Sequence, residues 1–459
     1  MKAVPTFDPA QVPGAATRRL AAFARNLTWR DIPEGVRHEA KRSLLNYVAS
    51  AVAGSGEPAI DKYIATMERF GGAPSAGVIG RRERCDMLMA ASVNAMSANI
   101  FDYDDTHSPT VIHPTAPVAP ALFAYAETEH CDGRALLQAL VLGIEIECRI
   151  GNVVSPSHYG RGWHITSTCG VFGAAMAVGA LLGLTEEEHA WALGNASAQA
   201  AGLCETLGTM SKSISVGNAA RNGIVSALLA ADGFSGPAAP LEGPRGFLPV
   251  FSDEIRLEAL FDGLGETWES AKNTYKPYPA GIVLHPVIEA CLELHRRGAF
   301  SIDEVATVEL TGATLLRQRT DRPGVTSGRE SQVSAQHAVA IAFRRGRAGL
   351  AEFNDDAVAE ALGDANRIKL RFMDDDSYDI ESARVVVHTH NGETHEVMVS
   401  DARGGARNPM TDDDLENKLA TLTEWRGVSM DVDALAEAVW SIETAPDASA
   451  IMNLTAIRA

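Results

Sequence analysis

Cysteine is scarce in this sequence, and the few thiols are far apart. The six cysteines occupy positions 85, 131, 148, 169, 204 and 291 of 459 residues. No two are spaced as a CxxC pair, which excludes the common zinc and redox motifs, and six are too few for a disulfide scaffold. Scattered thiols suit a reducing compartment. We therefore expect a cytoplasmic protein.

Long apolar runs and excess positive charge are also missing. The most apolar stretch, 170–184, has about 15 residues, whereas a membrane-spanning helix needs roughly 20. Residues 1–19 contain three prolines and no continuous apolar segment, unlike a secretory signal. Lys and Arg total 40 against 59 Asp and Glu, a formal net charge of −19. Such a surface repels phosphate groups, so we expect neither a nucleic-acid nor a membrane partner.

Several catalytic and nucleotide-binding motifs are absent. The sequence has no Walker loop, no well-placed GxGxxG after a strand, no GxSxG elbow and no HExxH pair. These absences argue against a nucleotide cofactor, a serine hydrolase and a zinc protease.

The first 265 residues contain Ala- and Leu-rich segments of helical length. We expect helices at 36–52, 89–99, 118–129, 135–150, 168–182, 186–203 and 219–231. Residues 169–182 carry no charge, so that helix should be buried on all sides.

The pattern changes near residue 270. Strands are expected at 305–310, 368–372, 384–390 and 394–399, a helix at 332–344, and further helices at 411–425 and 431–441. Asn391-Gly392 predicts a hairpin with a type I′ turn. The predicted fold is mainly α with an α+β lid: a helical domain in 1–270, a smaller α/β domain in 271–402, and a return to the helical domain in 403–459.

Negative charge is absent from two long stretches of this acidic chain. Residues 151–182 and 206–231 contain no Asp or Glu but keep several basic residues. They are His158, Arg161, His164, Lys212 and Arg221. A pocket that binds an anion would need cations and backbone N–H groups without competing carboxylates. A pair of buried helices would show the same depletion.

Residues 101–113 form the densest polar cluster, with Asp102, Asp104, Asp105, His107 and His113. Carboxylates with imidazoles can bind a divalent metal. They can also act as an acid–base site in which a carboxylate orients a histidine. A solvated loop before a helix is the third interpretation.

Two further segments could contribute to a site. His164 precedes the charge-free helix, where the helix dipole favours a neutral imidazole, and Thr166, Ser167 and Thr168 can cap that helix. The loop 208–213 contains Lys212 and leads into a helix, a natural cradle for a carboxylate or phosphate. Lys276 lies between aromatic and proline residues at the expected domain junction.

In combination and in this order, these motifs resemble the MmgE/PrpD family. The resemblance rests on 102–107 with His113-Pro114, on Gly162-Trp163-His164, on Met210-Ser211-Lys212 with 217–223, and on 275–279. The family includes 2-methylcitrate dehydratase, cis-aconitate decarboxylase and iminodisuccinate epimerase. It implies a large helical domain built from both chain ends, a smaller α/β lid, a homodimer, and no metal or organic cofactor.

The resemblance also implies roles for particular residues. Asp102, Thr106, His113 and His164 would line the pocket, and Lys212 and Lys276 would bind substrate carboxylates. We predict His113 and His164 as the acid–base pair, oriented in part by Asp102. Thr106 would hydrogen-bond the substrate, and Arg221 is a weaker binding candidate.

Two departures separate the sequence from cis-aconitate decarboxylases. The spacing from Thr106 to His113 is one residue longer, and 315–323 offers Arg317, Arg319 and Arg322 where those enzymes contribute a tyrosine. Trp163-His164 and 208–212 are more similar to the epimerase-like branch.

The predicted function is a cofactor-independent lyase or isomerase. It would move a proton at the carbon next to a carboxylate of a small di- or tricarboxylic acid. Dehydration, decarboxylation and epimerisation all remain open. The alternatives are a metal-dependent synthase on a helical fold and a non-catalytic helical scaffold.

Overall fold

The computed structural model describes residues 16–457, so most of the N-terminal segment considered above lies outside the described residues. The chain forms two compact units. Unit 1 comprises 16–100, 104–273 and 412–457, and unit 2 comprises 101–103 and 274–411. From the sequence we expect the two main boundaries near residues 270 and 402.

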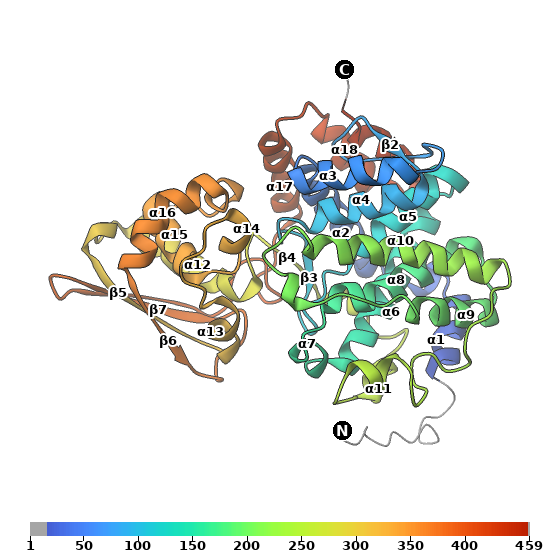
Figure 1. The fold of residues 1–459 in the computed structure, drawn as a ribbon, viewed down its shortest axis with the longest axis horizontal. Coiled ribbons are helices and arrows are strands. Elements are labelled where there is room, and N and C mark those ends of the chain that lie inside the picture. The colour runs from blue at the N-terminus through green and yellow to red at the C-terminus, as the bar shows by residue number, and fades with distance from the viewer. Residues whose placement is uncertain (1–15, 458–459) are drawn as a thin grey trace. The chain divides into compact units, whose positions relative to one another are not determined.

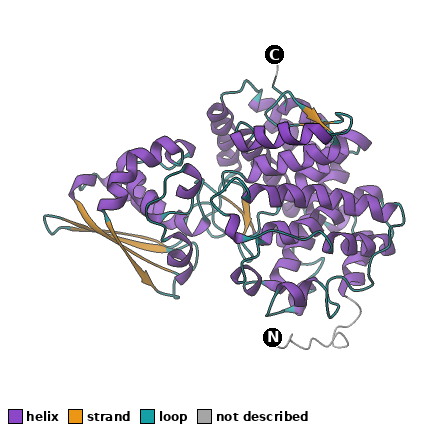
Figure 2. Cartoon of the chain, viewed as in Figure 1, coloured by secondary structure: helices purple, strands orange, loops and turns teal. Residues whose placement is uncertain are grey.

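Unit 1 is helical, and its helices stack in layers (Figures 1 and 2). They are α1 (Ala16–Asn26), α2 (Glu34–Gly54), α3 (Pro58–Met67), α4 (Met87–Asn99), α5 (Thr115–Glu129), α6 (Gly133–Val154), α7 (Ser157–Gly160), α8 (Ile165–Leu182), α9 (Glu186–Ser197), α10 (Lys212–Ala231), α11 (Phe247–Phe251), α17 (Asp412–Arg426), α18 (Val432–Trp440) and α19 (Ala450–Thr455). Its short strands are β1 (Ala76–Gly77), β2 (Arg84–Cys85) and β3 (Asp105–His107).

Helix α8 lies at the centre of unit 1 and packs against α5, α6, α9 and α10. Every residue from Ile165 to Gly179 is buried, which confirms the expectation from its charge-free sequence, while 180–182 at the end of the helix are half-buried. By length and composition it could span a membrane, but 83% of it is buried inside the protein, as expected of a core helix. Small residues let its neighbours approach closely: a Cβ on Gly223 of α10 would lie 2.4 Å from the Cβ of Ala174.

The C-terminal helices complete unit 1. Helix α17 packs along α2. The Lys418 ammonium donates to Asn46 Oδ1 at 2.8 Å in a buried contact, and Arg426 Nε donates to Ser55 Oγ at 3.1 Å. Residues from both ends of the sequence therefore form one core, as the family resemblance implied.

Unit 2 is built around a four-stranded sheet. The strands are β5 (Val305–Gly312), β6 (Lys369–Asp374), β7 (Ala383–Thr389) and β8 (Thr394–Val399), in the order β6-β5-β7-β8. The helices are α12 (His285–Arg297), α13 (Thr314–Thr320), α14 (Gly328–Ser331), α15 (Ala335–Arg345) and α16 (Asp355–Arg367), and β4 (Asn273–Tyr275) lies at the boundary.

Strand β5 pairs with β6 in parallel and with β7 antiparallel. Val308 opposes Val387 and Leu310 opposes Val385, and all four are buried in the core of unit 2. Figure 2 shows helices gathered over one face of the sheet, where α12 packs against β7 and β8.

Three local predictions differ from the structure. Helix α9 ends at Ser197 rather than 203, because the chain turns back so that Gly202, at φ 136°, can accept a hydrogen bond from the amide of His164. Helix α10 begins at Lys212, seven residues before its expected start. The 389–393 hairpin is not type I′: Gly392 has a positive φ but Asn391 does not, as in a three-residue loop with a bulge.

Candidate functional site

His113 is held beside strand β3 by a tight loop. The amide of His107 donates to the carbonyl of Ile112 at 2.8 Å, and Val111 takes a positive φ of 57° to close the loop. The side chain of His113 is buried, and its backbone amide donates to Thr166 Oγ1 in the first turn of α8 at 3.1 Å. The sequence thus brings the loop after β3 against the start of α8.

Three oxygen atoms surround Nδ1 of His113. The carbonyl oxygen of Asp105 lies 2.7 Å away, Asp104 Oδ1 lies 3.3 Å away, and Thr106 Oγ1 lies 3.4 Å away. Because a carbonyl oxygen can only accept, Nδ1 must carry the hydrogen. Nε2 is then the nitrogen that can take up a proton.

Asp104 and Asp105 turn their carboxylates in different directions. Asp104 Oδ2 accepts from Asn99 Nδ2, at the last residue of α4, at 2.7 Å. Asp105 Oδ2 accepts from Thr115 Oγ1 at 2.5 Å and from Asn273 Nδ2 at 2.6 Å. Burial raises the pKa of Asp105 to about 7, although these hydrogen bonds and its neighbour Asp104 also act on it.

His164 is the residue from which α8 starts. It is buried, with 4% of its surface exposed, and Nδ1 lies 3.3 Å from both Ser167 Oγ and Ser215 Oγ. The expected capping by Ser167 and Thr168 is wrong: both hydroxyls donate to the carbonyl of His164 instead of accepting from helix N–H groups.

Lys212 is the first residue of α10 and is also buried. Its carbonyl accepts from Ser215 Oγ at 2.9 Å, and the same hydroxyl faces His164. Ser215 therefore joins the first turn of α10 to the N-terminus of α8. Unit 1 brings together His113, His164 and the start of α10, which are up to about a hundred residues apart in the chain.

Asp102 and Lys276 form a pair within unit 2. The Lys276 ammonium donates to Asp102 Oδ2 at 2.8 Å and to the Asp102 carbonyl at 3.0 Å. The lysine side chain is 3% exposed. The Asp102 carboxylate thus neutralises a buried lysine. Its predicted part in orienting a histidine stays a prediction.

Arg221 does not face the same way as Lys212. The two are separated by about two and a half turns of α10, which puts them on opposite faces of the helix. Arg221 Nε donates to Asn222 Oδ1 at 3.2 Å. Its predicted role in substrate binding receives no support from this position.

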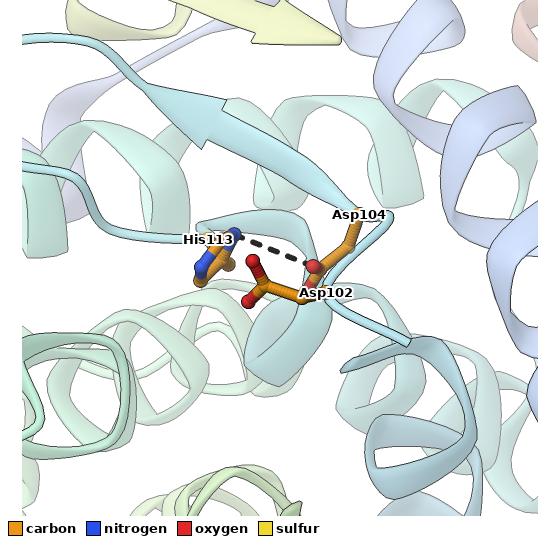
Figure 3. Close-up of side chains that lie close together, drawn as sticks. All are labelled: Asp102, Asp104 and His113. Carbon is orange, nitrogen blue, oxygen red and sulfur yellow. Dashed lines mark ion pairs between the residues drawn. The ribbon is translucent and has the colours of Figure 1, made fainter. Parts of the chain in front are cut away.

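Asp102, Asp104 and His113 are residue types that bind divalent metals, and Figure 3 draws them together. Two contacts oppose a metal there. Nδ1 of His113 is the ring nitrogen 3.3 Å from Asp104 Oδ1, but it points at a carbonyl oxygen and so carries a hydrogen, and the Asp102 carboxylate is paired with an ammonium group. As paired here, neither group offers a lone pair to a metal between them, which gives the metal-dependent alternative no support.

Sequence reasoning missed Asp104, Thr166 and Ser215. The sequence places three acids within residues 102–105 and gives no signal for which one faces an imidazole. Serine and threonine near a helix start were expected to cap it, whereas Thr166 and Ser215 join His113 and His164 to neighbouring segments.

Family comparisons cover both units. The MmgE/PrpD N-terminal domain matches residues 18–259, and the MmgE/PrpD C-terminal domain matches 278–444.

Relatives over most of the chain are named for decarboxylation. A cis-aconitate decarboxylase-like protein of Aspergillus oryzae is 28% identical over 96% of this chain and 97% of its own length. The cis-aconitate decarboxylase of Aspergillus terreus is 32% identical over 61% of this chain and 60% of its own length. The cis-aconitate decarboxylase of Mus musculus is 25% identical over 96% of this chain and 93% of its own length. The chain belongs to the MmgE/PrpD family.

Proposed function

We propose that this protein is a lyase of the decarboxylase or dehydratase type that acts on a small di- or tricarboxylic acid without a cofactor. The relatives named above as cis-aconitate decarboxylases support this class, and cis-aconitate is the first substrate to test. The observation that carries the proposal is the meeting in unit 1 of two buried histidines with the segment that begins at Lys212.

The chemistry common to these reactions is a carbanion-like state next to a carboxylate. When a C–H bond breaks at that carbon, or a C–C bond breaks to release CO2, the electron pair spreads onto the neighbouring carboxylate; in a dehydration this pair then expels hydroxide from the adjacent carbon. A buried ammonium such as that of Lys212 would stabilise this charge more strongly as it develops. An imidazole would then give a proton to the carbon, or take one from it. We assign these proton transfers to His113 and His164.

The sequence alternatives receive unequal support. The pairing of His113 and Asp102 described above gives no support to a metal-dependent synthase. Epimerisation stays a prediction from the Trp163-His164 signature. Arg317 lies on the surface of unit 2, where its Nε and Nη2 both donate to Asp374. This position gives no support to the idea that Arg317 binds a further carboxylate of the substrate. A homodimer and a cytoplasmic location also stay predictions.

The first test is turnover. Purified protein is incubated with cis-aconitate, citrate, 2-methylcitrate and iminodisuccinate in D2O, with CO2 release and deuterium incorporation followed by NMR. We expect release of CO2 or water from at least one tricarboxylate, and undiminished activity in the presence of a chelator. Deuterium exchange with no net bond cleavage would favour the epimerase, and no reaction or exchange would favour the scaffold.

Substitutions test the residues. We expect His164→Gln to reduce kcat about 10²- to 10⁴-fold, because a positioned acid or base contributes a factor of that size. Lys212→Ala should reduce kcat/KM by a similar factor. The controls are His130→Gln and Lys62→Ala, which change an exposed histidine and an exposed lysine of unit 1. Wild-type turnover by either site variant, with folding verified by circular dichroism, would reject the assignment.

A further inference from the structure

We propose that Asp104 is the positioning residue of His113: it holds a negative charge against the protonated imidazole, and Asn99 fixes its direction. This inference rests on the proposed function, because it assigns a partner to the histidine that would exchange a proton there. It concerns residues of unit 1 alone.

The two carboxylate oxygens of Asp104 contact different residues. Oδ2 accepts from Asn99 Nδ2 at 2.7 Å, and Oδ1 lies 3.3 Å from His113 Nδ1. The residue is 1% exposed, and Oδ1 has no hydrogen bond of its own. Burying a carboxylate oxygen without a hydrogen bond destabilises the folded protein, and a protonated imidazole beside that oxygen would offset the destabilisation. Figure 3 marks this ion pair.

The tautomer of His113 does not depend on Asp104. The Asp105 carbonyl oxygen, at 2.7 Å, already holds the hydrogen on Nδ1. In a histidine–carboxylate pair the carboxylate often supplies both tautomer and charge. Here the backbone carbonyl of Asp105 fixes the tautomer, and the Asp104 carboxylate supplies the charge. Loss of the Asp104 charge should therefore change the acidity of His113 without turning the ring.

Two other carboxyl groups lie near this segment, those of Asp105 and Glu147. The Asp105 carboxyl accepts from Thr115 and Asn273, and burial raises its pKa. Glu147 on α6 interacts with Asp105, and burial raises its pKa well above the usual range, which disfavours its charged form.

The remaining charged groups belong to the segments named earlier. His164 begins α8, Lys212 begins α10, and Asp102 is paired with Lys276 within unit 2. Among the described residues of unit 1, Asp104 is a carboxylate whose oxygen lies 3.3 Å from Nδ1 of His113.

Asp104→Asn removes the charge with little change of shape. The new side chain can present its oxygen to His113 if the Asn99 amide turns over, and Asn99 Oδ1 has no hydrogen-bond partner to hold it. A carboxylate favours the protonated form of a neighbouring imidazole by one to three pH units. We expect the acidic limb of the kcat/KM profile to move down by about one pH unit, and kcat/KM to fall about 10- to 100-fold.

Two further variants separate positioning from structure. Asn99→Ala keeps the charge but releases the carboxylate, so it should lower kcat/KM with a smaller displacement of the pH profile. Glu147→Gln removes another buried carboxyl group of unit 1 that does not contact His113, and it should leave the pH profile unchanged. A purely structural role for Asp104 would lower activity while the pH profile stayed in place.

A titration without substrate keeps this inference distinct from the proposed function. ¹⁵N NMR of the imidazoles, with His113 assigned from a His113→Gln spectrum, gives the titration midpoint directly. A midpoint about one pH unit lower in Asp104→Asn supports the inference whatever the substrate is. An unchanged midpoint overturns it, even if the wild-type enzyme turns over a tricarboxylate. Absence of turnover with a shifted midpoint would reject the proposed function alone.

Discussion

Glu147 is a carboxyl group buried among the apolar helices of unit 1. Neither of its oxygens has a hydrogen-bond partner among the described residues, and a Cβ on Gly173 of α8 would lie 2.6 Å from Oε2. Burial raises its pKa well above the usual range, so the folded chain keeps a proton that the unfolded chain releases above about pH 4.5.

The sign of the linkage gives a prediction for Glu147→Gln. Between pH 5 and 8 the folded wild-type protein holds more protons at this position than the unfolded chain, so its stability falls as pH rises. Glutamine does not titrate. We expect the unfolding free energy of the variant relative to wild type to increase from pH 5 to pH 8, measured by urea denaturation. If the variant and the wild type differed in unfolding free energy by the same amount at pH 5 and pH 8, Glu147 would have to ionise in the folded state as it does in the unfolded chain.

At this scale the sequence predicts residue types better than partners. His113, His164 and Lys212 were selected because imidazole and ammonium groups in a stretch without carboxylates suit an anion. Asp104 was not preferred over Asp102, because side-chain direction depends on the folded backbone. Asp102 takes a positive φ of 52°, which a sequence pattern does not reveal.

The presence of helices in unit 1 was predicted more reliably than the residues at which they begin and end. The burial of α8 follows from its lack of charge, and Thr185 with Glu188 forms a capping box at the start of α9. The errors at the end of α9 and the start of α10 arise at Gly202 and Lys212, where contacts between distant segments decide the boundary. The hairpin was found at the right place with the wrong turn type.

The crossing of α8 and α10 gives a prediction about packing. Gly223→Ala would put a methyl group 2.4 Å from the Cβ of Ala174 and 2.9 Å from backbone atoms, so the helices must separate. We expect destabilisation of about 1–3 kcal/mol, the usual effect of overpacking. Gly363→Ala is the matched control: no atom lies within 4 Å of the new methyl group on α16. Alanine should stabilise that helix by up to about 1 kcal/mol.

Chemical denaturation of both variants measures the contrast. If Gly223→Ala were as stable as wild type, the close approach of the two helices would not be needed for the stability of unit 1.

The response of the whole molecule to acid follows from two buried histidines of unit 1. His158 and His189 are 0% and 1% exposed, and burial lowers the pKa of each to about 4. In the unfolded chain both should titrate near 6.5. Between these values the unfolded chain binds more protons, so stability is complete above about pH 6.5 and is lost as pH falls toward 4.

We expect each histidine to account for about 3 kcal/mol of this loss, at 1.36 kcal/mol per pH unit. His189→Gln should reduce the dependence of unfolding free energy on pH between 6.5 and 4.5, whatever its effect at pH 7. His130→Gln, at an exposed position, provides the control. An unaltered slope in His189→Gln would mean that this histidine is protonated in the folded protein.

The pairing of α2 with α17 has a consequence for biosynthesis. During translation α2 leaves the ribosome well before the residues that cover it, because Lys418 and Arg426 follow their partners in α2 and the loop after it by 372 and 371 positions. The nascent polypeptide carries an incomplete apolar surface while these positions are made, whereas the intervening α/β unit has all of its own strands available. Chaperone binding to the growing chain should persist until α17 has left the ribosome.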